Sequence, residues 1–312
     1  MKNISDKFYI GIDSGGTKCE ILIVSGNEER KILYSKFYKG VHYSIAGVEQ
    51  YSNAVCEFIK SSLSEAKLNL KNCIAIGAGV AGAREEKDRL NLEKSFRKKL
   101  NYKNILITTD AMTALYGAFE GDDGIILISG TGSVLYGLSN GYLTRVGGWG
   151  RIIGDEGSGY WIGKRALNLI TKEFDKRKNE GSLLSKKLRK KFGITKENVN
   201  EKIFRKNIEI QSIAPVVIDL ANKKCDVSLK IVNEAVDGLI EHIVTFLEVS
   251  GRKKNIKIAF IGSIIENKNL LSDNLQKKIR KLKIVEVVTK KHLPAFGAVL
   301  LAMENSDITK KL

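Results

Sequence analysis

The first stretch that could support chemistry is the turn DSGGTK at residues 13–18, which lies between two apolar runs. A bare hairpin turn needs a single glycine, whereas this turn also carries a carboxylate, two hydroxyls and a lysine. Glycines let a backbone approach a ligand closely, and successive N–H groups in a tight turn bind anions. Beside bound phosphates, Asp13 would hold Mg²⁺ through water. The predicted phosphate-binding residues of this turn are Gly15, Gly16, Thr17 and Lys18.

A second turn of similar composition, SGTGS at residues 129–133, also joins two apolar runs. Two such turns at equivalent places in two halves of a chain, facing each other across a cleft, would bind a polyphosphate from both sides. The alternative is two ordinary hairpin turns, which need no clustered hydroxyls. The predicted phosphate-binding residues here are Gly130, Thr131, Gly132 and Ser133.

Other phosphate-loop motifs do not account for these turns. The chain contains no GxxxxGK[ST] sequence, the signature of a P-loop. The run GAGVAG at residues 77–82 matches GxGxxG, but it follows the fourth predicted strand, and a dinucleotide-binding fold requires it after the first. We interpret this run as closely packed backbone that lines the cleft.

Asp110 follows the apolar run ILITT and precedes AMTALYGAF, which has helical spacing. Phosphoryl transfer to an alcohol requires a carboxylate at the acceptor hydroxyl, and Asp110 is the candidate for this base. The alternative is a helix N-cap, a common role of aspartate at such a position.

The stretch VGGWGRIIGDEGSGYWIG at residues 146–163 contains seven glycines, both tryptophans of the chain, Asp155 and Glu156. Apolar faces of sugar rings pack on aromatic side chains, and sugar hydroxyls pair with carboxylates. This composition therefore predicts a sugar site. The alternative is that one or both tryptophans fill the core beneath the loop.

The order of predicted elements indicates how these residues are positioned. Strands at 8–14, 19–25 and 31–38 precede a helix at 44–67, after which strands and helices alternate up to residue 119. A second set of three strands begins at residue 123, followed by helices, two more strands and a closing helix. This repetition predicts an internally duplicated α/β protein with a cleft between its halves.

We place an N-terminal domain at residues 1–113 and a C-terminal domain with a helical insertion at residues 114–312. The formal net charge of +17 makes nucleic acid a conceivable partner. However, the basic runs lie far apart in helix-like stretches without interleaved aromatic residues, which favours solvated helix faces. We therefore predict no nucleic-acid partner.

The four cysteines form no CxxC pair, and no apolar run reaches the ~18–20 residues of a membrane helix. The N-terminal residues also lack the apolar core of a signal peptide. We expect a cytoplasmic protein with reduced thiols and no membrane partner.

In their order and spacing these motifs resemble those of the actin-like ATPase and sugar-kinase superfamily. Within it, TTDA, ISGTGS, GGWGRIIGDEGSGYWIG and PAFGAVLLA are similar to the BadF/BadG/BcrA/BcrD ATPase family, in its N-acetylglucosamine kinase branch. The resemblance spans nearly the whole chain. It implies a duplicated ribonuclease H-like (actin-like) α/β fold with two domains, mixed sheets and an interdomain cleft, and a homodimer as the assembly.

The resemblance also implies ATP-dependent phosphorylation of a sugar 6-hydroxyl, with ATP and Mg²⁺ as cofactors. Asp110 would deprotonate that hydroxyl, Asp13 would serve Mg²⁺, and Gly262 and Ser263 would lie near adenosine. The residues that it assigns to the sugar site are His42, Tyr43, Asp110, Val134, Trp149, Gly150 and Asp155.

Two departures from the family pattern concern the sugar site. Relatives carry asparagine where this chain has His42, and can carry asparagine where it has Val134. N-acetylglucosamine is the favoured acceptor; a broad-specificity hexokinase or a glucosamine kinase is the alternative, and N-acetylmuramate stays open. His42 can also be a solvent-facing loop residue.

Rival functions lack their signatures. An ATPase activator of a 2-hydroxyacyl-CoA dehydratase would bind a [4Fe–4S] cluster through two cysteines after the second turn, but no cysteine falls between Gly130 and Lys224, and Cys225 alone cannot supply the pair. A sugar-responsive regulator is expected to carry a DNA-binding domain, and the first strand already begins by residue 8. A zinc-bearing kinase of the ROK type is disfavoured because its Cys/His cluster is missing.

Overall fold

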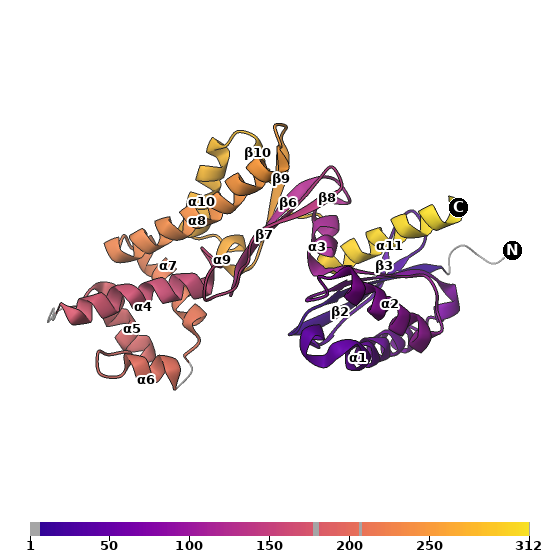
Figure 1. Cartoon of the computed structure of the whole chain (residues 1–312), viewed down its shortest axis with the longest axis horizontal. Helices are drawn as coiled ribbons and strands as arrows, with labels where there is room; N and C mark the ends of the chain where they lie inside the picture. Colours follow the sequence, from indigo (N-terminus) through magenta and orange to yellow (C-terminus); the bar gives the residue numbers. More distant parts are fainter. Residues whose placement is uncertain (1–6, 177–180, 206–207, 312) are drawn as a thin grey trace. The chain divides into compact units, whose positions relative to one another are not determined.

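The computed structural model describes residues 7–176, 181–205 and 208–311, and the chain divides into two compact units (Figure 1). Unit 1 comprises Met1–Asp122 and Lys290–Leu312, and unit 2 comprises Asp123–Thr289. Each unit contains one five-stranded sheet with helices packed against it. The C-terminal segment therefore belongs to the same unit as the N-terminal half of the chain.

The sheet of unit 1 combines a β-meander with two parallel strands. β1 pairs antiparallel with β2 and β2 pairs antiparallel with β3, whereas β4 runs parallel to both β1 and β5. The strand order is β3-β2-β1-β4-β5. The strands are β1 (Phe8–Ser14), β2 (Lys18–Ser25), β3 (Ile32–Lys39), β4 (Cys73–Val80) and β5 (Ile105–Thr109).

Helices cover both faces of this sheet because the central strands are apolar on both sides. Ile10 and Ile12 of β1 point into the core beneath α1 and α2, whereas Tyr9 packs with residues of α11 on the other face, as expected from the two-residue period of a strand. The helices are α1 (Tyr43–Glu65), the 3₁₀ turn η2 (Leu70–Asn72), α2 (Glu86–Leu100), α3 (Asp110–Phe119) and α11 (Pro294–Lys311).

The packing of α11 on the sheet depends on glycines. A Cβ at Gly11 of β1 would lie 2.0 Å from the carbonyl oxygen of Ala295, and a Cβ at Gly77 of β4 would lie 2.0 Å from that of Ala298. Any larger residue would hold the helix away from the strands. The run at residues 77–82 therefore serves as closely packed backbone, but the contact of Gly77 is with α11.

The sheet of unit 2 has the order β10-β9-β6-β7-β8. β6, β7 and β8 form an antiparallel meander, and β9 runs parallel to both β6 and β10. The strands are β6 (Gly124–Ser129), β7 (Ser133–Ser139), β8 (Tyr142–Gly147), β9 (Ile256–Ile261) and β10 (Val285–Val287).

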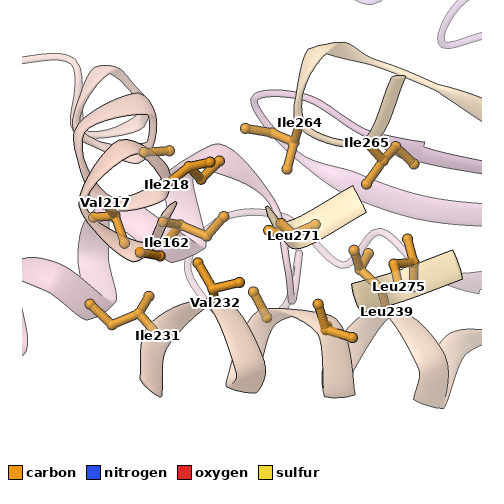
Figure 2. Close-up of a cluster of buried hydrophobic side chains, with 14 of the residues drawn as sticks. Ile162, Val217, Ile218, Ile231, Val232, Leu239, Ile264, Ile265, Leu271 and Leu275 are labelled. Carbon is orange, nitrogen blue, oxygen red and sulfur yellow. The ribbon is translucent and has the colours of Figure 1, made fainter. Parts of the chain in front are cut away.

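An insertion of helices between β8 and β9 supplies most of the core of unit 2. Figure 2 shows side chains from α4, α7, α8, α9 and α10 in this core, among them Ile162, Val217 and Leu239. The inserted helices are α4 (Gly159–Asp175), α5 (Leu183–Phe192), α6 (Val199–Phe204), η3 (Ile210–Ile213), α7 (Ala214–Asn222) and α8 (Asp226–Ser250). The helices α9 (Ser263–Glu266) and α10 (Leu270–Lys281) follow β9 and precede β10.

The two sheets share one topology, a three-stranded meander whose first strand is extended by two parallel strands. This confirms the predicted duplication and the α/β class with mixed sheets. The boundary between the two units differs from the predicted domain boundary, which lay between residues 113 and 114. All of α3 and the closing helix α11 belong to unit 1. The physical reason is the small-residue surface of β1 and β4, against which α11 packs.

No helix within the described residues combines the length and apolar character needed to cross a lipid bilayer.

Candidate functional site

The carboxyl ends of three strands in unit 1 meet at one edge of the sheet. Ser14 at the end of β1 pairs with Val80 of β4, and Val80 pairs with Thr109 at the end of β5. Asp13 and Asp110 therefore lie at the same edge, close enough for the charge of Asp110 to raise the pKa of Asp13. Ligands of open α/β sheets bind at this carboxyl edge.

Turn 1 (residues 14–18) presents unpaired backbone N–H groups at that edge. The Gly15 amide donates to the Lys18 carbonyl oxygen at 3.0 Å, and the Gly40 amide donates to the Thr17 carbonyl oxygen at 3.0 Å. Among the described residues, no backbone carbonyl accepts a hydrogen bond from the amide of Gly16 or Thr17. Because both residues are exposed, the turn can bind an anion.

Asp13 is a partly buried carboxyl whose pKa is raised to about 6. Burial is the main cause; repulsion from Asp110 and Glu20 adds to it, and Lys18 acts in the opposite direction. Glu20 is 6% exposed, lies opposite Asp13 in the β1–β2 register and accepts a hydrogen bond from Ser35 Oγ at 3.1 Å. Glu20 is not among the site residues predicted from the sequence, although it lies as far from the centre of the turn as Asp13 does.

Asp110 is the first residue of α3, and Thr109 caps that helix. Thr109 Oγ1 accepts a hydrogen bond from the Met112 amide at 3.2 Å, and Asp110 Oδ1 accepts one from the Ala111 amide at 3.0 Å. Asp110 is exposed, but protein atoms on its inner side desolvate the carboxyl and raise its pKa, which the backbone N–H groups and Arg84 partly counteract. The capping role therefore belongs to Thr109, which leaves Asp110 available as a proton acceptor.

The segment after β3 places His42 against turn 1. A Cβ at Gly16 would lie 2.6 Å from His42 Cδ2, and His42 Nδ1 lies 3.0 Å from Ser44 Oγ. Tyr43 is only 7% exposed, and its ring packs edge-on against Tyr51 with 5.7 Å between the ring centres. The structure thus brings His42 to the turn and places Tyr43 in the core of unit 1.

Turn 2 (residues 129–133) is tied to the glycine–tryptophan loop of unit 2. The Ser133 hydroxyl donates to the carbonyl oxygen of Glu156 at 2.6 Å. Within the described part of the chain, the amides of Thr131 and Gly132 have no backbone acceptor, as in turn 1. The Ser133 hydroxyl therefore holds the loop, and the anion-binding capacity of the turn lies in these two amides and the exposed Thr131.

Asp155 connects the loop to turn 2. Its Oδ1 accepts a hydrogen bond from the Gly150 amide at 3.1 Å, and its Oδ2 lies 2.7 Å from the position of a Cβ at Gly132. The residue is 8% exposed and has a φ of 60°, a left-handed conformation that is unfavourable for non-glycine residues. Asp155 therefore fixes the loop, and its contact with a sugar stays a prediction.

The predicted adenosine-site residues lie next to turn 2. β9 pairs in parallel with β6, Ile261 opposite Ile128, so the chain leaves β9 beside the end of β6. A Cβ at Gly262 would lie 2.4 Å from the carbonyl oxygen of Ser129, and Gly262 has a φ of 104°, which suits glycine alone. Ser263 then begins the short helix α9.

The two tryptophans have different environments. Trp149 is 71% exposed, and the guanidinium carbon of Arg145 lies 5.2 Å from its ring centre. Trp161 packs against the core of unit 2. Val134 contacts the backbone beside Trp149, because a Cβ at Gly148 would lie 2.8 Å from Val134 Cγ2. Trp149 is thus open to a ligand, whereas Trp161 is partly buried against the core of unit 2.

The predicted residues form two clusters, one in each unit. The cluster of unit 1 contains turn 1, His42 and the two aspartates. The cluster of unit 2 contains turn 2, the glycine–tryptophan loop and the Gly262 turn. No three His, Cys, Asp or Glu side chains gather into a metal site within the described ranges. Mg²⁺ usually binds through one or two carboxylates, water and substrate phosphates, and Asp13 beside the free amides of turn 1 fits such an arrangement.

Comparisons with known proteins agree with this architecture. The chain matches the BadF/BadG/BcrA/BcrD ATPase family over residues 10–302. It is 35% identical to the N-acetylmuramic acid/N-acetylglucosamine kinase of Clostridium acetobutylicum, over 96% of this chain and 100% of that protein. It is 30% identical to the N-acetyl-D-glucosamine kinase of Dictyostelium discoideum, over 97% of this chain and 99% of that protein.

Among solved structures, a Chromobacterium violaceum protein provisionally named an N-acetylglucosamine kinase superposes with a TM-score of 0.72 and 24% identity, covering 95% of this chain and 99% of that one. A ROK family glucokinase from Streptomyces griseus, solved with glucose and AMPPNP, superposes with a TM-score of 0.56 and 16% identity, covering 96% of this chain and 99% of that one. These likenesses confirm the resemblance drawn from the motifs and the actin-like fold that it implied.

Proposed function

Because the chain belongs to the BadF/BadG/BcrA/BcrD ATPase family, we propose that it is an ATP-dependent carbohydrate kinase that phosphorylates the 6-hydroxyl of an amino sugar, with N-acetylglucosamine as the favoured acceptor. The observation that carries the proposal is the position of Asp110, an exposed carboxyl at the sheet edge shared by Asp13 and turn 1. The kinase names of the two relatives support the reaction class.

In the proposed reaction Asp110 accepts the proton of the acceptor hydroxyl while its oxygen attacks the γ-phosphorus of ATP. A new P–O bond forms, the bond from the γ-phosphorus to the β,γ-bridging oxygen breaks, and ADP leaves with that electron pair. The amides of Gly16, Thr17, Thr131 and Gly132 bind phosphate oxygens. Mg²⁺, when bound at Asp13 through water, would neutralise phosphate charge.

The sugar would be recognised by an aromatic face and by polar groups. Trp149 offers an exposed ring to the apolar face of a pyranose, and Gly150 and Asp155 form the loop beside it. We assign the choice between N-acetylglucosamine, glucosamine and glucose to His42 and Val134, the two departures from the family pattern. A broad preference would support the hexokinase alternative.

The test is ADP release with Mg-ATP against a panel of N-acetylglucosamine, N-acetylmannosamine, glucosamine, N-acetylmuramate, glucose and mannose. We expect strong turnover with N-acetylglucosamine, and 6-phosphorylation of the product by NMR. A protein that binds ATP but phosphorylates none of these sugars would contradict the proposal. Sedimentation of the same sample tests the expected homodimer.

A further inference from the structure

Arg84 lies in the loop between β4 and α2, at the sheet edge that carries the proposed base. β4 ends at Val80, and Val80 pairs with Thr109, the residue immediately before Asp110. The loop therefore begins beside the strand that delivers the base, within the same unit.

Hydrogen bonds on two sides fix the backbone of this loop. The Ala81 amide donates to the carbonyl oxygen of Ser14 at 2.9 Å, which ties the start of the loop to the end of β1. The Arg89 guanidinium of α2 donates to the carbonyl oxygen of Ala83 at 3.1 Å and also to that of Arg84. Arg84 therefore projects from an anchored position.

The side chain of Arg84 is exposed, and no carboxylate of the described residues forms an ion pair with it. Its sequence neighbours Glu85 and Glu86 are acidic, but neither pairs with it in the described structure. The positive charge of Arg84 lowers the pKa of Asp110, which places the guanidinium within electrostatic reach of that carboxyl. An arginine in this position is available to an anionic group on the acceptor.

We propose that Arg84 recognises a carboxylate on the acceptor sugar, so that the site takes amino sugars with an acidic ether substituent on the ring in addition to neutral ones. This inference rests on the proposed kinase activity. A guanidinium binds a carboxylate through two parallel N–H donors, which supplies both charge and geometry.

N-acetylmuramic acid has the required chemistry, since it is N-acetylglucosamine with a lactyl ether at O3. The pyranose ring separates O3 from O6. A cation that binds the lactyl carboxylate therefore has no need to touch the base. Arg84 lies in the loop at the sheet edge that carries Asp110 and forms no ion pair with it in the described structure. The relative from Clostridium acetobutylicum carries both sugars in its name.

The test compares kcat/KM for N-acetylmuramate, its uncharged methyl ester and N-acetylglucosamine in wild type, Arg84→Gln and Arg84→Lys. All variants are assayed at one pH and one ionic strength. Arg30→Gln is the matched control, because Arg30 is an exposed arginine in the β2–β3 turn, at the opposite end of the sheet. We expect Arg84→Gln to lower the acidic-to-neutral ratio of kcat/KM about 10- to 100-fold, the range of a charged hydrogen-bonded pair.

Arg84→Lys should recover part of the ratio, because it keeps the charge and loses the paired donors. Added salt should raise KM for N-acetylmuramate in wild type and leave KM for N-acetylglucosamine nearly constant. Equal losses for all three sugars, or a rise in KM for ATP alone, would overturn the inference. Turnover of N-acetylglucosamine without any turnover of N-acetylmuramate would also overturn it while leaving the kinase proposal intact; failure with every sugar would reject both.

Discussion

The Asp155 carboxylate occupies the space that a side chain at residue 132 would need, because a Cβ at Gly132 would lie 2.7 Å from Asp155 Oδ2. The same carboxylate accepts a hydrogen bond from the Gly150 amide, so Asp155 contacts both turn 2 and the glycine–tryptophan loop. Gly132→Ala should displace Asp155, weaken ATP binding about tenfold or more and cost about 1–3 kcal/mol of unfolding free energy. Calorimetry and ATP titration check both effects. Gly130→Ala is the control for folding, since its Cβ would meet nothing within 4 Å; equal stability loss in both would contradict this account.

Asp110→Asn should abolish most turnover while leaving ATP binding intact. The asparagine side chain keeps the shape of the aspartate, and its Oδ1 can still accept the hydrogen bond from the Ala111 backbone N–H. It cannot, however, take the proton of the acceptor hydroxyl. We expect kcat to fall about 100- to 10,000-fold. Steady-state assays beside ATP titration separate the two effects. Near-normal kcat would remove Asp110 from the role of base.

Asp13→Asn should stabilise the protein at neutral pH. The folded-state pKa is raised from 3.8 to about 6, so ionisation of Asp13 destabilises the folded state. This cost is fully present above about pH 6, shrinks as the pH falls from 6 to 3.8, and is absent below 3.8. The shift corresponds to about 3 kcal/mol. Urea unfolding should show that Asp13→Asn has a much larger unfolding free energy than wild type at pH 7.5 and only a slightly larger one at pH 4.5. Asp122→Asn, at an exposed position, is the control. A gain in unfolding free energy that does not change with pH would argue against a raised pKa at Asp13.

The same pKa predicts the acidic limb of the activity profile. Protonated Asp13 cannot hold Mg²⁺, so the Mg²⁺ concentration for half-maximal turnover should rise as the pH falls through about 6. Mg²⁺ titrations of wild-type activity at pH 7.5, 6.5 and 5.5 measure this. A half-saturating concentration that does not change across this range would contradict Mg²⁺ binding at Asp13.

Trp149 should report sugar binding, because it is exposed, whereas Trp161 is partly buried against the core of unit 2. In Trp161→Phe the remaining fluorescence comes from Trp149, and saturating sugar should change it. In Trp149→Phe the sugar response should disappear and KM for the sugar should rise about tenfold, with stability within about 0.5 kcal/mol of wild type. A sugar response that survives in Trp149→Phe would place the site elsewhere.

Gly297→Ala should destabilise unit 1 more than a typical surface change, because the added Cβ would lie 1.9 Å from the carbonyl oxygen of Thr113 in α3. We expect a loss of about 1–3 kcal/mol and a lower kcat, since α3 carries Asp110. Urea unfolding and activity of the folded protein measure the two. Gly130→Ala is the stability control, because its Cβ would meet nothing within 4 Å and its φ is not in the left-handed region.

The sequence by itself determined the elements and the chemistry at their ends. Short apolar runs between glycine-rich turns identified the strands of both meanders, and glycine with hydroxyl residues identified both turns, because such preferences act within a few residues. It also placed Asp13 and Asp110 at strand ends, from which a shared sheet edge follows by the geometry of parallel strands.

Only the tertiary structure decided which elements pack against one another. α11 belongs to unit 1 because Gly11 and Gly77 admit its backbone, a fit between segments more than 200 residues apart that no local pattern encodes. The burial of Tyr43, the anchoring role of Asp155 and the exposure of Arg84 likewise depend on contacts across the chain. A pKa, an exposed face or an unpaired charge is set by whatever surrounds a group, and long-range packing determines that environment.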